Sequence, residues 1–314
     1  MWGYENMELI RDLHNLRPRH RGCALTIGNF DGVHRGHQAV IAQLVEIAAR
    51  IDVPSTALTF EPHPREFFSG ENAPARLTRF PEKMQVLAET PLDRVIVARF
   101  TRAFSQLSPE AFIDDVLIKA LDVRHVVVGE DFHYGHRARG TFMALEEAGQ
   151  RLGFGVTRCV TFEANGRRVS SSWVRDDLAD GELAKAGELL GRPYRIQGRV
   201  ARGARLGRSI GFPTANIPLR RLSTSLAGVY AVRLDGLADK PLAGMANLGT
   251  RPTVNGNEKL LEVHIFDFNA DIYGHHVSVE FVHKVRDEQR FESLDTLKEQ
   301  IARDEGVARR MLDV

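Results

Sequence analysis

The pattern of hydrophobic and polar positions changes near the middle of the chain. Between residue 24 and about residue 190, short apolar runs alternate with longer segments whose apolar residues recur every three or four positions. The short runs predict strands buried on both faces, and the longer period predicts amphipathic helices. Strands are expected at 24–28, 56–60, 94–100, 125–129 and 155–160, and helices at 38–50, 81–89, 109–120 and 141–151. This alternation is typical of a doubly wound parallel sheet, an α/β fold.

After Pro193 the pattern becomes that of antiparallel strands. Turn residues separate β-rich runs at 228–234, 241–249, 259–268 and 276–286. In the last run Val277, Val279 and Phe281 fall on one face. The sequence therefore predicts a small antiparallel β-barrel, followed by a helix at about 293–303. A helical stretch at 170–190 links the halves, so we expect one domain at 1–188, including this helix, and a second at 189–314.

The composition is that of a globular protein with two domains. The 314 residues are 43% hydrophobic and 26% charged, which is enough for a core in each half. The net charge is +1 and no run of Lys or Arg stands out, which argues against binding to nucleic acid or to an anionic membrane. Polar and charged residues interrupt the apolar stretch 39–51, so we expect no membrane span.

The cysteines and the N-terminus bear on location. Cys23 and Cys159 are far apart and form no CxxC pair, which favours reduced thiols over a metal–thiolate site. The first residues lack the apolar core of a signal peptide. We therefore expect a cytoplasmic protein, and the sequence leaves open whether Met1 or Met7 is the start.

The sharpest motif is GNFDGVHRGH at 28–37, where the first strand turns into the first helix. Ligands of doubly wound sheets bind at such turns. Gly28 and Gly32 let the backbone approach a ligand closely, and the helix start presents N–H groups and a positive dipole end to phosphate. His34 and His37, one turn apart, can aim at the same phosphates. Hydrogen bonds from them would stabilise the charge that develops in adenylyl transfer.

Less specific interpretations of this loop exist. The HxxH spacing alone would favour a glycine-rich turn with two surface histidines. A zinc pair is less favourable still, because two ligands are too few and no third is spaced nearby. The loop is not a Walker A motif, since GxxxxGK[ST] is absent from the chain. The full ten-residue string favours a phosphate site.

Three further segments can converge on the same crevice. TFEPHP at 59–64 follows the second strand, VGEDFHYG at 128–135 follows the fourth, and VSSSWVR at 169–175 opens the linking helix. Serines are good N-caps, and Arg175, one turn on, can offer a fork of donors to phosphate. Each segment alone would be an ordinary turn, loop or capped helix, but all lie at strand ends or helix starts.

Together these four segments resemble the bacterial FMN adenylyltransferase domain, a branch of the HxGH nucleotidyltransferases. The resemblance implies a Rossmann-like N-terminal domain in which His34, His37 and Arg175 are catalytic. The residues that it assigns to ATP and FMN binding are Gly28, Asn29, Phe30, Asp31, Gly32, Pro62, His63, Gly129, Asp131, Phe132, Ser170, Ser171 and Ser172. The family motif SSTxIR often has Thr where this chain has Ser172, a change that keeps the hydroxyl.

The second half carries GRVARGARLGRSIGFPTAN at 198–216. Its glycines supply flexible backbone that can wrap a nucleotide, although isolated glycines usually mark turns. Thr214 and Asn216 are two residues apart in an extended segment, so their side chains share a face. A hydroxyl and an amide oxygen are hard ligands, suited to Mg²⁺ bridged to phosphates.

This half resembles riboflavin kinase. The matching segments are GFPTAN (211–216), GVY (228–230), ANLGTRPT (246–253), LEVHIFDF (261–268), IYG (272–274) and VRDEQRF (285–291). The resemblance implies a six-stranded barrel in which Thr214 and Asn216 hold Mg²⁺–ATP and Glu262 is the general base. The other residues that it assigns to ATP and riboflavin binding are Gly198, Gly203, Gly207, Gly211, Pro213, Asn247, Arg286 and Glu288. The chain lacks the proline usual just before GVY, a departure confined to the local loop.

The role of Glu262 has alternatives. In the run 259–268, Glu262 and His264 share one face of the strand, and Val263 and Ile265 share the other. If the apolar face packs inward, a plain solvent-facing acid would give the same pattern. His264 is the rival candidate for the base.

The resemblances predict a bifunctional enzyme that phosphorylates riboflavin to FMN and adenylylates FMN to FAD. Its partners would be ATP, riboflavin, FMN and FAD, with Mg²⁺ as the metal, and the chain would be a monomer or a weak homo-oligomer. Two alternatives are a chain that retains only one activity and a flavin-binding regulator without turnover. The regulator would predict loss of His37 or Glu262, and both are present.

Overall fold

The computed structural model describes residues 7–202, 211–253 and 256–314. Gly203 and Gly207, which the resemblance assigns to the kinase site, lie outside the described residues. The chain divides into two compact units. The first comprises Met1–Pro74 and Phe80–Ser170, and the second comprises Ala75–Arg79 and Ser171–Val314.

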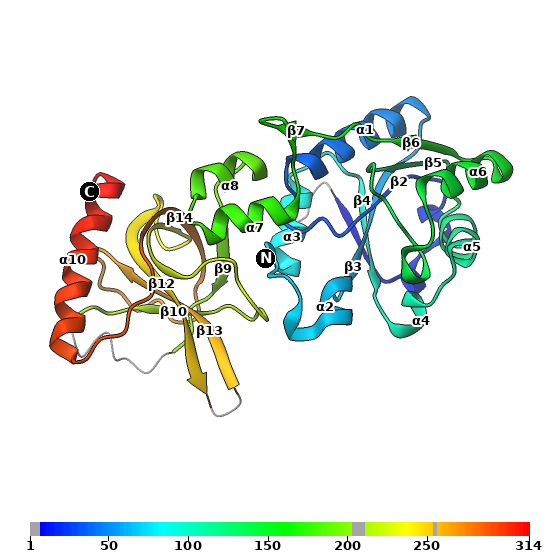
Figure 1. Ribbon diagram of the computed structural model, residues 1–314. Helices are drawn as coiled ribbons and strands as arrows, with labels where there is room; N and C mark the ends of the chain where they lie inside the picture. Colours follow the sequence, from blue (N-terminus) through cyan, green and yellow to red (C-terminus); the bar gives the residue numbers. More distant parts are fainter. Residues whose placement is uncertain (1–6, 203–210, 254–255) are drawn as a thin grey trace. The chain divides into compact units, whose positions relative to one another are not determined.

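The first unit is built on a six-stranded sheet whose strands all run parallel, in the order β1-β4-β3-β2-β5-β6 (Figure 1). This confirms the predicted doubly wound α/β fold. The strands are β1 (Glu8–Arg11), β2 (Ala24–Ile27), β3 (Ser55–Glu61), β4 (Arg94–Arg99), β5 (His125–Val128) and β6 (Gly155–Arg158). The helices are α1 (Arg35–Arg50), α2 (Pro64–Ser69), α3 (Phe80–Ala88), α4 (Arg102–Ser105), α5 (Pro109–Ala111) with its π-helical continuation η4 (Phe112–Ala120), and α6 (Phe142–Leu152).

Both faces of this sheet are covered, which is why its strands read as continuous apolar runs. Ala24 of β2 packs in the cluster that α1 and α3 complete on one face, and Leu25 packs in the cluster that η4 and α6 complete on the other. The sequence pattern does not predict the edge strand β1, which pairs with β4. Its four residues are of mixed polarity and carry no clear period.

The strand order places the predicted ligand loops at one edge of the sheet. Strands β3 and β4 lie on one side of β2, whereas β5 and β6 lie on the other. The order therefore reverses between β2 and β5, and the crevice at such a point lies outside the carboxyl ends of the strands. The loops after β2 and β5, which carry two of the predicted motifs, flank this position.

The second unit contains a six-stranded antiparallel sheet in the order β10-β13-β12-β11-β14-β9 (Figure 1). A bridge between Ala201 and Asn216 nearly closes it into a barrel, as predicted. The strands are β9 (Arg195–Arg199), β10 (Ala215–Pro218), β11 (Gly228–Asp235), β12 (Leu242–Thr253), β13 (Gly256–Ile265) and β14 (His276–Arg286). Val277, Val279 and Phe281 are buried, so the predicted inner face of β14 is confirmed.

Helix α10 (Leu294–Leu312) packs against the outside of the barrel (Figure 1). Its Ala308 and Leu312 join a buried cluster with Ala231 and Met245, which point outward from β11 and β12. The helix begins where the sequence predicts it but continues well past residue 303, because Ala308 and Leu312 extend its apolar face.

The predicted linking segment forms two helices, α7 (Ser171–Ala179) and α8 (Leu183–Leu190). Both belong to the second compact unit, together with the short segment Ala75–Arg79. The hydroxyl of Tyr194 donates to the carbonyl of Leu77 at 3.1 Å. The compact units thus divide at Ser170, whereas the functional boundary at 188 and 189 stays a prediction.

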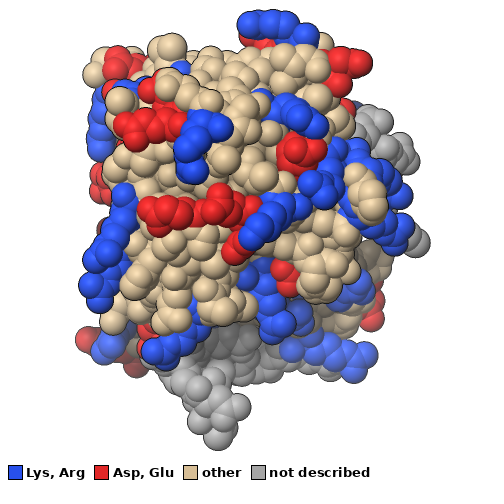
Figure 2. All heavy atoms as spheres, turned by 90° about the vertical axis from the view of Figure 1, so that its right-hand side faces the viewer, with Lys and Arg blue, Asp and Glu red and all other residues tan. Residues whose placement is uncertain are grey.

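The face of the molecule in Figure 2 shows basic and acidic side chains scattered over its surface, and neither sign gathers into one large patch. Among the described residues, no helix is both long enough and apolar enough to cross a membrane.

Candidate active sites

The first candidate site is the loop between β2 and α1. Phe30, Gly32 and Val33 have φ angles of 48°, 81° and 42°. A positive φ is strained for a side chain as bulky as Val33, yet Phe30 and Val33 are buried at 2% and 0% exposure. Packing therefore holds this loop in one shape. The other predicted residues in the loop are Gly28, Asn29 and Asp31.

The two predicted histidines meet at the start of α1. His34 is the N-cap, and its Nδ1 accepts a hydrogen bond from the backbone N–H of His37 at 3.3 Å. An accepting Nδ1 places the proton of a neutral His34 on Nε2. The two imidazoles stack with ring centroids 3.7 Å apart and planes 18° apart. The three-residue spacing thus brings the rings together, as the sequence suggests.

The environment keeps His37 neutral. Burial lowers the pKa of His37 well below 6.5, and the positive charges of His34, Lys83 and Arg168 lower it further. Stacked imidazoles also disfavour two protonated rings, because like charges would lie close together. At neutral pH the pair can therefore act as hydrogen-bond donors to phosphate without carrying two charges.

The turn after β3 lies next along the same edge of the sheet. The peptide bond between Glu61 and Pro62 is cis. His63 is 8% exposed and caps α2, since its Nδ1 accepts from the backbone N–H of Arg65 at 3.1 Å. The predicted Pro62 and His63 are thus fixed at the carboxyl end of β3, one strand away from the histidine pair.

An aromatic cluster that sequence reasoning missed lies beside this turn. Its members are Phe60, Phe67, Phe68, Phe100 and Phe104, with ring centroids 5.3–5.8 Å apart in the contacting pairs. Phe68 is 67% exposed, which is unusual for a large apolar side chain. In the sequence these phenylalanines occur at or soon after the carboxyl ends of two neighbouring strands, β3 and β4, and this pattern could have predicted the cluster.

The loop after β5 carries Gly129, Asp131 and Phe132. A hydrogen bond from Arg168 on the hairpin strand β8 (Arg167–Arg168) lowers the pKa of Asp131. The ring of Phe132 stacks on Tyr134 with centroids 5.6 Å apart. These predicted residues therefore lie in the loop after β5, across from the histidine loop (28–37) at the point where the strand order reverses.

The remaining predicted residues of this site fall at the division of the chain. Ser170 ends the first compact unit, and Ser171, Ser172 and Arg175 lie on α7 in the second. The Nε of Arg175 donates to the carbonyl of Ala75, within the second unit. Within the first unit alone, the structure brings together the loops after β2, β3 and β5.

The second candidate site is a row of polar residues across three strands of the barrel. Asn216 of β10 lies opposite Glu262 of β13, and Glu262 lies opposite Asn247 of β12. Directly opposed residues point to the same face, about 5 Å apart between Cβ atoms. Their neighbours Leu261 and Val263 are buried inside the barrel, so the polar row lies on its outer face. The Val263 face thus packs inward, which is the condition under which Glu262 could also be a plain solvent-facing acid, so its role as the base stays a prediction.

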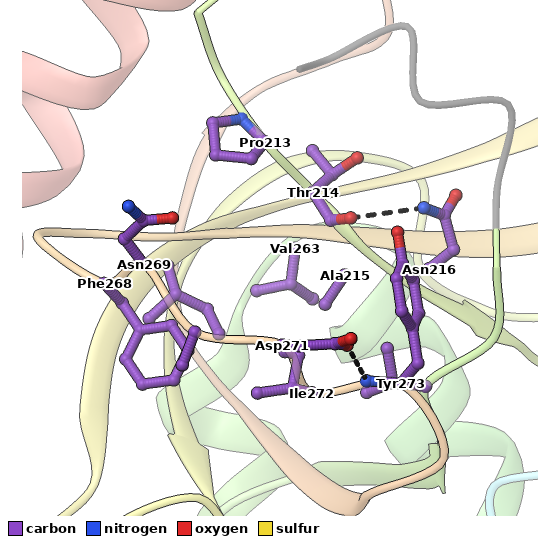
Figure 3. Close-up of a pocket in the computed structure, with 13 residues that line it drawn as sticks. Pro213, Thr214, Ala215, Asn216, Val263, Phe268, Asn269, Asp271, Ile272 and Tyr273 are labelled. Carbon is purple, nitrogen blue, oxygen red and sulfur yellow. Dashed lines mark hydrogen bonds between the residues drawn. The ribbon is translucent and has the colours of Figure 1, made fainter.

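The predicted metal ligands line a cavity of about 180 Å³ (Figure 3). Thr214, Asn216, Asp271 and Tyr273 are among its lining residues; in this view Asp271 lies across from Thr214, and the ring of Tyr273 lies beside Asn216. Asn216 is 8% exposed, and its Nδ2 donates to the carbonyl of Thr214 at 3.3 Å. That bond orients the amide and leaves its Oδ1 as the atom suited to a cation.

The donor set suits a hard cation. Among the described residues there is no group of three or more His, Cys, Asp or Glu side chains placed to hold a metal. The hydroxyl of Thr214 and the amide oxygen of Asn216 are the oxygen ligands that Mg²⁺ takes when phosphates complete its shell. The residues present therefore fit Mg²⁺ better than a transition metal.

Two glycines that the resemblance assigns to the kinase site, Gly211 and Gly198, have different surroundings. Gly211 is exposed with a φ of 94°. Gly198 faces the barrel interior, where an added Cβ would lie 2.4 Å from Cγ2 of Ile217. Close packing against Ile217 thus explains why residue 198 is a glycine, and its contact with substrate stays a prediction.

His264, the rival base, contacts the segment that leads into β10 and carries the first of the predicted metal ligands. Its Nδ1 lies 2.8 Å from the carbonyl oxygen of Pro213. A carbonyl can only accept, so this nitrogen carries the proton. His264 thus contacts the residue just before Thr214, and its Nε2 lies 3.9 Å from Oε2 of Glu305. The choice between Glu262 and His264 as the base stays a prediction.

The predicted flavin contacts Arg286 and Glu288 lie at the end of β14. Arg286 donates from Nε and Nη2 to the buried carboxylate of Asp304 on α10, at 2.8–3.1 Å. The carboxylate of Glu288 reaches back over Gly249, where an added Cβ would lie 2.5 Å from it and 3.4 Å from the amide nitrogen of Asn247. Glu288 thus lies near one end of the polar row.

A histidine pair at a helix start in one unit, and a hydroxyl, amide and carboxylate set on a barrel in the other, define a chain with two nucleotide-dependent transferase domains. Residues 16–173 match the FAD synthetase family, and residues 190–312 match the riboflavin kinase family. The chain belongs to the bifunctional riboflavin kinase/FMN adenylyltransferase family.

Relatives match over almost the whole chain. The bifunctional riboflavin kinase/FMN adenylyltransferase of Escherichia coli K12 is 52% identical, over 96% of this chain and 97% of its own. The protein of the same name from Haemophilus influenzae is 48% identical, over 96% and 98%. A crystal structure from Streptococcus pneumoniae, described as a macrolide-efflux protein, has a TM-score of 0.80 and 29% identity, covering 97% of this chain and 99% of that one.

The chain is therefore an enzyme with an N-terminal FMN adenylyltransferase domain and a C-terminal riboflavin kinase domain. This confirms the predicted function and both predicted activities. ATP and flavins are its small-molecule substrates and products.

Proposed function

We propose that the loop after β2 and the histidine pair form the adenylyl-transfer site. An oxygen of the FMN phosphate attacks the α-phosphorus of ATP, the bond between that phosphorus and the bridging oxygen breaks, and pyrophosphate leaves. His34 and His37 donate hydrogen bonds to the phosphate oxygens on which charge develops. The stacked pair at the N-terminus of α1 carries this proposal. Contacts from Pro62, His63, the residues 129–132 and Ser170 complete it. The roles that the resemblance assigns to Ser171, Ser172 and Arg175 stay predictions.

The exposed aromatic cluster beside His63 suits the flavin ring. A planar isoalloxazine is recognised by aromatic faces and edges, and Phe68 offers a largely exposed ring next to the turn that carries Pro62 and His63. The flavin would then lie at the carboxyl ends of β3 and β4, close to the loop that positions the phosphates.

For the kinase we propose that the polar row on the barrel is the reaction site. Glu262 orients the primary hydroxyl of riboflavin and accepts its proton as the oxygen attacks the γ-phosphorus of ATP and ADP leaves. Thr214 and Asn216 hold Mg²⁺, which would neutralise charge on the transferred phosphate. The adjacent cavity takes part of the nucleotide, and Asn247, Arg286 and Glu288 contact the flavin side (Figure 3).

We also propose that the protein acts in the cytoplasm as a monomer or weak homo-oligomer and does not use nucleic acid. The cysteines Cys23 and Cys159 are free thiols, as expected of a reducing compartment.

Two conservative variants test which site does which reaction. Asn is an excellent N-cap, so His34→Asn keeps the helix start of α1 and removes the imidazole. It should slow conversion of FMN to FAD and leave conversion of riboflavin to FMN unchanged. Thr214→Ala should do the reverse and should raise the Mg²⁺ concentration needed for half-maximal FMN formation. Chromatography of flavins, starting from riboflavin or from FMN, separates the two steps. Equal loss of both steps in either properly folded variant would overturn the assignment.

A further inference from the structure

One buried lysine contacts the histidine loop of the adenylyl-transfer site and belongs to none of the four sequence segments that predicted this site. Lys83 is on α3 and is only 3% exposed. Ammonium groups are almost never fully buried, because loss of hydration costs several kcal/mol unless polar partners replace the water. A buried lysine at this place therefore needs a reason beyond the stability of the helix.

Its partners come from two different parts of the site, the loop after β2 and the carboxyl-terminal part of strand β3. The Nζ of Lys83 donates to the carbonyl of Asn29 at 3.1 Å and to Oγ1 of Thr59 at 3.0 Å. The hydroxyl of Thr59 in turn donates to the same carbonyl at 3.3 Å. Asn29 belongs to the loop that carries the histidines, and Thr59 lies just before the turn with Pro62 and His63. One ammonium group thus joins the histidine loop to the end of the strand that leads into this turn.

The loop that it fastens is the strained one. Asn29 directly precedes Phe30, which has a positive φ of 48°. A strained backbone persists only where its surroundings fix it, and Lys83 fixes the carbonyl next to the strained residue. Displacement of this carbonyl would shift the loop whose shape places His34 and His37.

The charge of Lys83 also reaches the histidine pair. The charged or titratable groups that act on His37 are His34 on the same helix, Lys83 on α3 and Arg168 on β8. Each of them favours the neutral imidazole. Removal of the Lys83 charge therefore makes protonation of His37 easier.

We propose that Lys83 is a positioning residue for adenylyl transfer, because its ammonium group joins Asn29 and Thr59 and so sets the distance between the histidine loop and the turn that carries His63. The inference rests on the proposed adenylyl-transfer site. Lys83 does not contact the reacting atoms in this scheme. It holds the histidine loop against the end of β3, and its charge favours the neutral form of His37.

The test is Lys83→Met in the full chain, since Met keeps the length of the side chain and removes its charge and donors. A misplacement of about 1 Å in a reacting group can cost on the order of 10²-fold in rate, so kcat for FAD formation from FMN should fall by that order. The acid side of the pH–rate profile should move to higher pH. FMN formation from riboflavin, measured in the same sample, should stay at the wild-type rate. Lys119→Met is the matched control, because Lys119 is an exposed helix residue paired with Asp115.

Thr59→Val provides a second measurement that does not depend on how well Lys83→Met folds. Val keeps the shape of Thr and removes the hydroxyl that joins Lys83 to Asn29. It should lower kcat for FAD formation in the same direction by a smaller factor, and the double variant should lose less than the product of the two factors. Lys83→Met with wild-type kcat and pH profile, or Thr59→Val with the wild-type kcat, would overturn the proposal. His34→Asn tells the two possible failures apart. If it too leaves FAD formation unchanged, the proposed adenylyl-transfer site is wrong. If it slows FAD formation, the site stands and only the role of Lys83 is wrong.

Discussion

In the first unit the core of the site, the histidine loop, is one continuous segment, whereas in the second unit the polar row comes from strands far apart in the sequence. Phe30, His34 and His37 lie within one loop and one helical turn. Asn216, Glu262 and Asn247 are neighbours only because β10, β13 and β12 pair in a particular register. Both sites handle ATP and a flavin, so the contrast lies in construction and not in chemistry.

The difference follows from the two kinds of sheet. A parallel sheet gathers the carboxyl ends of its strands at one edge, so a site there is built from loops and from the start of a helix. An antiparallel barrel offers no such edge, and its polar groups must be placed by cross-strand pairing. We therefore expect the first site to depend on loop shape and the second on strand register and the helix that supports it.

The largest expected effect comes from the centre of the polar row. Glu262→Gln keeps shape and hydrogen bonding but removes the basic oxygen, so riboflavin turnover should fall by roughly 10²–10⁴, the usual worth of a positioned base. Binding of riboflavin and ATP should change little, because the loss belongs to the transition state. FAD formation from added FMN should persist. A Glu262→Gln enzyme with near-normal FMN production would contradict the comparison, because the polar row would then be an ordinary polar surface and not the reaction site of the kinase.

A somewhat smaller effect should follow from the support of the barrel site. Asp304 is 3% exposed and receives the guanidinium of Arg286 as well as a hydrogen bond from Gln300 at 2.8 Å. Removal of one partner from a buried ion pair typically costs about 3–5 kcal/mol, and we expect the lower end for Asp304→Ala because Arg286 can partly reach water. Denaturant unfolding and the rate of FMN formation should both change. Glu299→Ala on the exposed face of α10 is the control, and equal behaviour of the two variants would contradict the supporting role.

The comparison also explains how much could be predicted from the sequence. The histidine loop of the first site can be predicted because its residues are contiguous: GNFDGVHRGH already contains the glycines, the N-cap and both histidines. The row of Asn216, Glu262 and Asn247 has no such local string, because its geometry depends on pairing register. Only resemblance to the kinase family points to it. The same limit applies to the segment Ala75–Arg79, whose place in the second unit depends on tertiary contacts.

Two supporting residues are marked in the sequence by a charged side chain on an apolar helix face. Lys83 shares a helix face with Leu87, one turn on, and Asp304 shares one with Ala308 and Leu312. A charged residue in register with an apolar face is expensive to bury, so it indicates a buried partner. The pattern shows that a partner exists but does not identify it, since Asn29 and Arg286 come from distant parts of the chain.

The histidine pair provides the next prediction. His37→Ala should lower FAD formation by on the order of 10²–10³, the usual loss for one donor that stabilises transition-state charge. FMN formation in the same chain serves as the internal control. Because burial lowers the pKa of His37, wild-type FAD formation should also stay constant as the pH falls to 6.5 and decline only below it. FAD formation by His37→Ala at the wild-type rate would show that His37 packs at the helix start without acting as a donor in the reaction.

The smallest expected effect concerns the exposed ion pair of the first unit, Asp131 and Arg168, which is the counterpart of the buried pair on α10. Their side chains are 67% and 45% exposed, so solvent screens the interaction. Asp131→Asn should therefore lower the free energy of unfolding by less than about 1 kcal/mol at neutral pH. Arg168 lowers the pKa of Asp131 below 3.8, so the pair stabilises the folded state above that pH and the contribution disappears as the pH falls through the lowered pKa. The difference in stability between wild type and variant should thus be constant from neutral pH to about pH 4, shrink below it, and shrink with added salt. Denaturant unfolding at several pH values measures this difference. A loss comparable to that of Asp304→Ala would show that the first site also depends on a fixed ion pair, and the contrast between the two units would then fail at this point.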